Sequence, residues 1–515
     1  MVLKKSIILK KYAWHKSESV AVVGFCWNGT QFYEGSSFAD YIFRKSKTHD
    51  IFLETLKLLN GQFSVIVEKQ GEIWVATSHT WSFPIFYHQS EEELVLSDNP
   101  DIVLEKINPK NIDSQSKKYF LMFGVTPQNR TLIQDLIQIK PAEVLMFSDS
   151  SLQSFSLLEN KNNVSLKAGT EEELHDTILI LFKRYYDIIK DKQVLLPLTS
   201  GYDSRLLACL LKQFGHKNVL CSTWGRKGNV EVATAQKVAQ SLGYKHIFVE
   251  YNSKLISGFS KNEKFINYFN YAGHLSSMPF LQDYFAIDYL IENKVIDAET
   301  IVLPGHSGDY FAGSHLTEET ENAKNSGLFS RILEKCSCSY PLSRHFLKEI
   351  ETHINDRFFI EELLAPWQKF EKWDFQERQS KLISNSNQVY LFKGLNFMMP
   401  LFDKEFISFF DKIPFSQKLN ADFYNSTLEN KFFAPQNVLF DLKGKQHAKS
   451  NFPMLKKLIL KLTPHLFKKF YYPMNDAIFY NEITSELILE MEKYKFRHPS
   501  KPHAFNSYLI QWYLY

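Results

Sequence analysis

The stretch Leu195–Arg205, which reads Leu-Leu-Pro-Leu-Thr-Ser-Gly-Tyr-Asp-Ser-Arg, holds residues whose types and order can do chemistry. An apolar run predicted as a buried strand ends in small hydroxyl and glycine residues, and a helix is predicted directly after them. Backbone N–H groups in such a turn, together with the helix N-terminus, form a cradle for an anion. Asp203 would repel a phosphate there unless a divalent cation lay between them, so the stretch indicates Mg²⁺-bound pyrophosphate. An ordinary strand–turn–helix with a capping Asp fits the same spacing.

Strands and helices alternate along the part of the chain that surrounds this stretch. We expect helices over 171–189, 205–214 and 231–242, and strands over 194–198, 219–224, 246–249 and 300–303. This order predicts a doubly wound parallel sheet with right-handed crossovers, and ligands bind at the carboxyl ends of such strands. Beyond about residue 255 most periodic segments are predicted to be helical.

Residues 1–158 show a different pattern, with short β-branched and aromatic runs. We expect strands over 20–25, 63–67 and 73–76, a hairpin turn over 68–72 and one amphipathic helix over 50–59. The pattern is typical of an α+β sandwich. The polar, Asn-rich segment 159–163 is the predicted linker, which gives two domains, 1–158 and 165–515.

Composition excludes several classes of protein. With 515 residues and 44% hydrophobic residues the chain is predicted to be globular, and 60 basic against 57 acidic residues give no electrostatic case for nucleic-acid binding. Five cysteines are too few for a disulfide scaffold of this length, which favours reduced thiols in the cytoplasm. We find no signal-peptide pattern and no window of about 18–20 apolar residues, so no transmembrane segment is expected.

Thr199–Ser204 resembles the S-G-G-x-D-S pyrophosphate loop of the ATP-pyrophosphatase superfamily, and specifically of asparagine synthetase-like enzymes. Further segments resemble that family in the same order: Trp224-Gly225 with the 231–246 helix and strand, Gly305–Gly313, Pro400–Asp403 and Lys449–Pro453. The ordered set spans nearly the whole chain. It implies a HUP-like, doubly wound ATP-pyrophosphatase domain whose C-terminal part is mostly helical.

The first half resembles class II glutamine amidotransferase domains, at Asn60–Ile66, at Trp81–Tyr87 and over 120–147. The resemblance implies an Ntn-hydrolase-like αββα sandwich. Such glutaminases use an N-terminal Cys as nucleophile. Here Met1 is followed by Val2, the first cysteine is Cys26, and Ser78–Ser82 lacks the family's R-D-x-x-G pattern. We therefore expect a catalytically dead domain with a structural or docking role.

The resemblance implies ATP and Mg²⁺ as ligands and assigns residues to them. The predicted nucleotide-binding residues are Leu198, Thr199, Ser200, Gly201, Tyr202, Asp203, Ser204, Trp224 and Gly305. Asp203 and Asp309 are the predicted Mg²⁺ ligands. A late lysine would stabilise charge on the pyrophosphate and on the tetrahedral intermediate; Lys449 fits by its spacing, with Lys443 and Lys445 as alternatives.

Some positions depart from the family. His306 stands where asparagine synthetases have Glu and β-lactam synthetases have Tyr, and its imidazole can take a proton from an amine near neutral pH or merely cap a Gly-rich turn. Asn396 and Met398 stand where the family usually has Glu and Arg. These changes argue against the ordinary reaction of aspartate with ammonia.

The expected function is an ATP-dependent amide-forming ligase that activates a carboxylate as an acyl-adenylate and lets an amine or ammonia displace AMP. Relatives of this organisation close β-lactam rings, cyclise lasso peptides or amidate sugars, so a peptide, a sugar or a biosynthetic partner protein is an open partner class. The alternatives are a glutamine-hydrolysing asparagine synthetase and a nucleotide-binding pseudoenzyme. The basic segment Leu455–Phe470 fits a helix that touches a membrane surface or an acidic partner, or one that buries a face.

Overall fold

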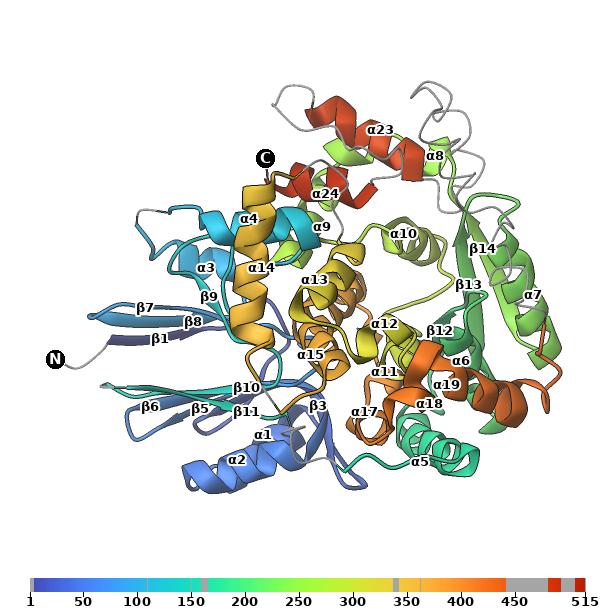
Figure 1. Cartoon of the computed structure of the whole chain (residues 1–515), viewed down its shortest axis with the longest axis horizontal. Helices are drawn as coiled ribbons and strands as arrows, with labels where there is room; N and C mark the ends of the chain where they lie inside the picture. Colours follow the sequence, from blue (N-terminus) through green and yellow to red (C-terminus); the bar gives the residue numbers. More distant parts are fainter. Residues whose placement is uncertain are drawn as a thin grey trace.

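The computed structural model of the chain describes residues 4–108, 110–149, 151–158, 165–336, 342–361, 363–440, 480–491 and 505–514. The predicted linker, the predicted basic helix over 455–470 and the three candidate lysines Lys443, Lys445 and Lys449 lie outside these residues. The first half is rich in strands, and the second combines a parallel sheet with many helices (Figure 1). None of the described helices is both long and apolar enough to cross a membrane.

Two sheets form the first half. The larger has the strand order β11-β10-β6-β5-β3-β2 with β4 beside β3, and the smaller has the order β1-β8-β7-β9. The strands are β1 (Lys4–Ile8), β2 (His15–Ser17), β3 (Val20–Asn28), β4 (Gln31–Glu34), β5 (Leu59–Lys69), β6 (Glu72–Thr77), β7 (Phe86–Gln89), β8 (Glu93–Ser97), β9 (Ile137–Gln138), β10 (Glu143–Phe147) and β11 (Leu152–Ser156). The hairpin turn lies where the sequence predicts it, because Gln70 and Gly71 both have positive φ and join β5 to β6.

Helices cover both outer faces of these sheets. They are α1 (Gly35–Lys45), α2 (His49–Leu58) and α3 (Pro100–Leu104), while α4 (Ser114–Phe123) packs with its buried face in the core of the second half. Phe38 of α1 and Phe52 of α2 pack on the larger sheet, and Val103 of α3 packs on the smaller one. The two sheets share an apolar layer that includes Ile66 and Leu96. The packed elements thus lie in the order helices, sheet, sheet, helix, and the sequence predicted only α2 among these helices.

The second half is built on a five-stranded sheet with the order β14-β13-β12-β15-β16, and every pair in it is parallel. The expected mixed α/β fold with a parallel sheet is therefore confirmed. Its elements are α5 (Glu171–Ile189), β12 (Val194–Pro197), α6 (Tyr202–Gln213), β13 (Val219–Gly225), α7 (Val230–Leu242), β14 (Lys245–Glu250), β15 (Ile301–Val302) and β16 (Asn396–Phe397). Further helices surround it: α9 (Glu263–Gly273), α10 (Tyr284–Glu292), α11 (Gly308–Phe311), α13 (Asn325–Glu334), α14 (Arg344–Phe358), α15 (Pro366–Trp373), η3 (Asp374–Ile383), α16 (Gln388–Phe392), η5 (Pro400–Phe402), α17 (Lys404–Asp411), α19 (Asp422–Leu428), α23 (Tyr480–Met491) and α24 (Phe505–Leu514).

Local chemistry explains where these elements begin. Thr170 and Glu173 form a capping box, so α5 begins at Glu171 as predicted. The prediction that a helix starts at residue 205 is wrong: α6 begins at Tyr202, because Gly201 adopts the extended N-cap geometry and the next residues already follow the helical path. The strand predicted over 300–303 is shorter, and only Ile301–Val302 pairs with its neighbours.

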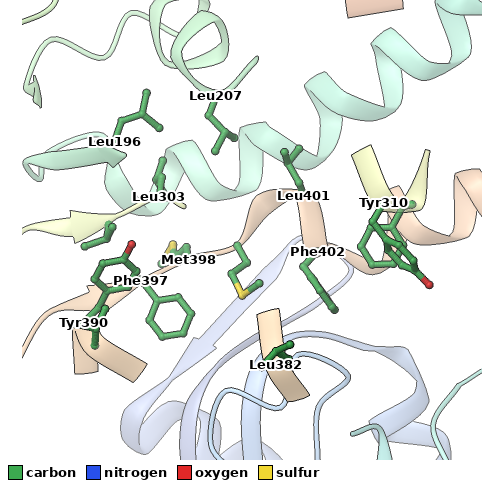
Figure 2. Close-up of a cluster of buried hydrophobic side chains, with 14 of the residues drawn as sticks. Leu196, Leu207, Leu303, Tyr310, Leu382, Tyr390, Phe397, Met398, Leu401 and Phe402 are labelled. Atoms are coloured by element: carbon green, nitrogen blue, oxygen red, sulfur yellow. The ribbon is translucent and has the colours of Figure 1, made fainter. Parts of the chain in front are cut away.

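A buried apolar cluster lies beneath the carboxyl ends of this sheet. Figure 2 shows Leu196 of β12 and Leu207 of α6 in this cluster with Leu303, Met398 and Leu401. Only 5% of the surface of Met398 is exposed. The position therefore contributes to packing, and its side chain brings no charge to the site.

Candidate active site

The turn after β12 is held by hydroxyl groups. The backbone N–H of Thr199 donates to Ser204 Oγ at 3.1 Å, and the N–H of Gly201 donates to Thr199 Oγ1 at 3.1 Å. Thr223 Oγ1 donates to the carbonyl oxygen of Leu198 at 2.6 Å, which fixes the end of the strand. Gly201, the N-cap of α6, has no side chain with which to cap the helix, so the first turn presents its N–H groups to a ligand.

A second loop, Pro304–Asp309, follows β15 and approaches the first one closely. A Cβ on Gly305 would come within 2.7 Å of the backbone nitrogen of Ser204. A Cβ on Gly308 would come within 2.9 Å of the carboxyl atoms of Asp203. Both positions therefore need glycine, and the two loops that the sequence analysis singled out meet in space.

Asp203 and Asp309 form a carboxylate pair where the loops meet. Asp203 is buried; its Oδ1 accepts a hydrogen bond from Tyr424 at 3.0 Å, and its Oδ2 accepts one from the backbone N–H of Asp309 at 3.1 Å. Burial raises the pKa of Asp203, and the charge of Asp309 raises it further. Asp309 is exposed, and its Oδ2 accepts a hydrogen bond from Ser314 at 2.8 Å.

This pair has the chemistry that Mg²⁺ requires. Two adjacent carboxylates repel each other, and a hard divalent cation removes that repulsion. Within the described part of the chain, no group of three or more His, Cys, Asp or Glu side chains forms a metal cage. Two carboxylates plus phosphate oxygens and water is an arrangement that Mg²⁺ commonly adopts, so the pair fits the ion.

A cavity of about 320 Å³ opens beside the turn. Six of the predicted residues line it: Leu198, Thr199, Ser204, Trp224, Gly305 and His306. The other predicted residues of the turn do not. The Ser200 carbonyl accepts a hydrogen bond from Arg205 at 3.0 Å, and the Tyr202 hydroxyl donates to Glu429. The side chain of Tyr202 therefore contacts Glu429, the first residue of η7 (Glu429–Phe433), and does not line the cavity.

The family model for asparagine synthase matches residues 187–434. Residues 187–434 form an asparagine synthase domain. This domain contains both loops, the carboxylate pair and every residue that lines the cavity. Lys449 lies beyond it.

Comparisons with curated proteins and with solved structures add less than the family model does. No curated protein matches the chain. Solved structures that match include the NH3-dependent NAD synthetase from Campylobacter jejuni subsp. jejuni NCTC 11168, at 14% identity over 41% of this chain and 93% of that chain with a TM-score of 0.23. The glutamine-dependent NAD+ synthetase from Acinetobacter baumannii matches at 12% identity over 65% of this chain and 76% of that chain, with a TM-score of 0.20. At these TM-scores the matches carry no argument about this chain.

His306 of the asparagine synthase domain is half-buried in the cavity wall, and its Nε2 lies 3.4 Å from Ser386 Oγ. Burial lowers the pKa of His306 to about 4. The imidazole is therefore neutral at pH 7 and can accept a hydrogen bond, but it is a weaker base than the sequence analysis expected.

Two site residues of the asparagine synthase domain escaped the sequence analysis. Asp283 lines the cavity and accepts a hydrogen bond from Tyr390 at 2.7 Å. Burial raises the pKa of Asp283 to about 6, against the lowering effect of hydrogen bonds from Tyr390 and Trp224. A lone acid within the apolar, aromatic run that leads into α10 was the available signal.

Arg205 is the second missed residue. Its side chain is fully buried beneath the turn, and its guanidinium donates to the carbonyl of Ser200 at 3.0 Å and to that of Val438 at 3.1 Å. It also lies 5.3 Å from the ring centre of Phe433. Arg205 therefore joins the turn to the C-terminal end of the described 363–440 stretch.

Proposed function

We propose that the chain is an ATP-dependent ligase that forms an amide bond through an acyl-adenylate. The observation that carries this proposal is the anion-binding turn after β12, with Asp203 beside Asp309, inside an asparagine synthase domain. A turn of hydroxyl and backbone N–H groups next to two carboxylates suits a nucleotide triphosphate accompanied by Mg²⁺.

In this reaction the triphosphate lies along the turn, where the N–H groups of the first turn of α6 and the hydroxyls of Thr199 and Ser204 bind its oxygens. Asp203 and Asp309 would hold Mg²⁺, which neutralises charge on the phosphates when it is bound. A substrate carboxylate oxygen forms a bond to the α-phosphorus while the bond to pyrophosphate breaks. An amine then attacks the acyl carbon, AMP leaves with the bonding electron pair, and the amine loses a proton.

His306 and Lys449 would act on the second half of this reaction. The neutral imidazole of His306 accepts a hydrogen bond from the incoming amine and so orients its lone pair. Its lowered pKa argues that the proton passes on to solvent rather than staying on the ring. Lys449 remains our candidate for the lysine that neutralises the leaving pyrophosphate.

We further propose that the first half does not hydrolyse glutamine. Its glutaminase-like residues are engaged by the other half: Gln62 Oε1 accepts the N–H of Met399 at 2.9 Å, and Asn60 Oδ1 accepts the N–H of Lys404 at 3.1 Å. Cys26 is fully buried, and burial raises the pKa of its thiol. The amine would then come from free ammonia or from a second substrate. We place the reaction in the cytoplasm, in keeping with the unpaired state of the four described cysteines.

The test is pyrophosphate and AMP release from Mg·ATP by the purified chain, measured against a panel of carboxylates and amines. Asp203→Asn should lower the substrate-dependent rate by at least about 100-fold, because the variant loses one of the two charges that would hold the cation. Asp187→Asn is the matched control, since Asp187 is an exposed partner of Lys183 on α5 and should leave the rate unchanged.

The outcomes separate the alternatives. Substrate-dependent release of both AMP and pyrophosphate supports the ligase. ATP binding without release across the panel would favour the pseudoenzyme, and release of glutamate from glutamine would favour a glutamine-hydrolysing asparagine synthetase.

A further inference from the structure

Ser307 lies in the loop that follows β15, and its backbone is in the left-handed region, with φ of 68° and ψ of −1°. It stands between His306, which lines the cavity beside the turn, and the start of α11 at Gly308. A residue other than glycine in this region costs free energy, and such residues persist only where their surroundings hold them. The loop that carries His306 and Asp309 therefore depends on the contacts that hold Ser307.

A buried amide of η3 contacts Ser307. The Ser307 hydroxyl donates to Gln379 Oε1 at 2.8 Å, and Gln379 Nε2 donates to Asp374 Oδ1 at 3.1 Å. Ser307 and Gln379 are 6% and 4% exposed, and Asp374 is fully buried. Because a carboxylate accepts hydrogen bonds, Asp374 turns the amide nitrogen toward itself and the amide oxygen toward Ser307.

The π-helical form of η3 brings Asp374 and Gln379 together. Hydrogen bonds in a π-helix join residues five positions apart, so positions 374 and 379 share a face. In an α-helix the same two positions would lie about 140° apart around the axis. Arg378 also approaches the pair, with Nη1 at 3.6 Å from Asp374 Oδ1. The helix geometry thus orients the amide that the loop needs.

Two parts of the candidate site depend on the conformation of Ser307. After it, the N–H of Asp309 donates to Asp203 Oδ2 at 3.1 Å, and the N–H of Phe311 donates to the Ser307 carbonyl oxygen at 3.1 Å. Before it, His306 lines the cavity. A return of Ser307 to negative φ would change the direction of the chain at this residue, so His306 and Asp309 would not both keep their places.

We infer that Gln379 is a positioning residue of the candidate site: by holding Ser307 in the left-handed conformation, it keeps His306 on the cavity and Asp309 against Asp203. Gln379 does not line the cavity, so it acts through Ser307 and not on a ligand. Its effect on turnover rests on the proposed function, whereas its hold on the loop does not.

Hydrogen–deuterium exchange of the full chain measures the hold on the loop without any substrate. Gln379→Met keeps the length of the side chain and loses both hydrogen bonds, so the amides of residues 304–313 should exchange at least about tenfold faster than in the wild type. Gln376→Met is the control, because Gln376 is a partly buried glutamine of the same helix that borders a different cavity. Exchange that is unchanged in Gln379→Met overturns the inference.

Glycine at position 307 separates positioning from general packing. Glycine adopts positive φ without the cost of a Cβ, so the Ser307→Gly loop no longer needs the amide. Gln379→Met should therefore have no further effect on exchange in the Ser307→Gly background, while Ser307→Ala, which keeps the Cβ and loses the hydroxyl, should exchange as fast as Gln379→Met. Equal effects of Gln379→Met in both backgrounds would show a packing role and would overturn the inference.

Pyrophosphate release extends the test to the proposed reaction. In Gln379→Met, kcat should fall by at least about tenfold because the reacting groups are displaced. The affinity for Mg·ATP should change less, since the turn after β12 keeps its own hydrogen bonds. The double variant should recover the rate of Ser307→Gly. Faster exchange with an unchanged kcat would overturn the role in positioning. A wild-type chain that releases no pyrophosphate would contradict the proposed function, and the exchange cycle alone would then decide the inference.

Discussion

Two sets of polar residues, one in each half of the chain, resemble catalytic motifs, and their surroundings differ. Thr199 and Ser204 border a cavity of about 320 Å³, with the helix N-terminus of α6 and the pair Asp203–Asp309 beside them. Asn60 and Gln62 instead bond to the backbone of residues 399–404, and both are buried. A ligand can therefore reach the first set, while protein already covers the second.

The difference shows that similar polar residues can either border a cavity or bond to the backbone of the other half of the chain. His79 makes the same point: its Nε2 donates to the carbonyl of Phe402 at 2.7 Å, and burial lowers its pKa to about 3. Where a buried polar side chain satisfies backbone groups of the other half, removing it costs stability. Substitutions of the same kind should therefore lower activity in the first region and lower stability in the second.

The largest expected contrast comes from glycine-to-alanine changes. Gly308→Ala places a Cβ within 2.9 Å of the Asp203 carboxyl group, so the carboxylate must move. A displacement of about 1 Å in a catalytic group costs about 100-fold in rate, so substrate-dependent pyrophosphate release should fall by about that factor while thermal unfolding changes little.

Gly61→Ala should have the reverse effect, a loss of stability without a loss of rate. Its Cβ would lie 2.3 Å from the backbone oxygen of Phe25 and 2.7 Å from Cα of Cys26, where neither strand can give way. We expect a loss of about 3 kcal/mol in the free energy of unfolding, measured by urea denaturation, with the rate per folded molecule unchanged. Gly327→Ala on α13, whose nearest neighbour atom is 3.4 Å away, is the control for both. A stable Gly308→Ala variant with full activity would remove the contrast.

Arg205→Lys tests whether the buried guanidinium supports the turn after β12 in the first region. A lysine lacks the planar fork that reaches both the Ser200 and the Val438 carbonyls, so one buried carbonyl loses its partner. We expect unfolding to become easier by about 2 kcal/mol and ATP affinity to fall by about tenfold, because the turn loses its support from below. Isothermal titration with Mg·ATP measures the second effect. Arg344→Lys, at an exposed position, should leave both unchanged.

Gln62→Ala tests whether this buried residue of the second region contributes to stability and not to a reaction. The variant leaves the buried N–H of Met399 without its acceptor, which should lower the free energy of unfolding by about 1–2 kcal/mol. Pyrophosphate release per folded molecule should not change, and Gln89→Ala at an exposed strand end should be neutral in both assays. Glutamine hydrolysis that is present in the wild type and lost in Gln62→Ala would instead restore a catalytic role to this region.

The sequence analysis identified the elements that depend on local patterns. The parallel sheet and the hairpin at Gln70-Gly71 follow from hydrophobic periodicity and turn chemistry, whereas the pairing of Asp203 with Asp309 was implied only by the family resemblance. The predicted start of α6 lies three residues too late. Asp203 and Ser204 favour both turns and helix starts; the prediction placed them in the turn, whereas they lie in the first turn of the helix.

Contacts between residues that lie far apart in the chain could not be predicted from the sequence. The Gln62–Met399 hydrogen bond joins residues 337 positions apart, and the Arg205–Val438 bond joins residues 233 positions apart. Neither partner belongs to a pattern that specifies the other, because such pairs are set by how whole layers pack. The weak basicity of His306 belongs to the same class, since it follows from burial that only the folded chain creates. The role of Lys449 stays a prediction.

The smallest expected effect is the pH dependence that Asp283 contributes to stability. It tests whether the cavity of about 320 Å³ excludes water around this carboxyl group. The carboxyl faces Trp224, Tyr390 and Tyr268, and burial raises its pKa to about 6 from the ordinary value of 3.8. A raised pKa in the folded state favours the protonated form, so its contribution to stability is fully present below pH 3.8 and is lost as pH rises through about 6. Between these values the free energy of unfolding of the wild type should fall by about 1 kcal/mol relative to Asp283→Asn, which does not titrate. Denaturation curves at about pH 3.5, 5.0 and 6.5, which bracket the window from 3.8 to about 6, would measure it. Parallel pH profiles for the two proteins would show that water fills the cavity and that bound nucleotide, rather than the protein alone, must exclude it.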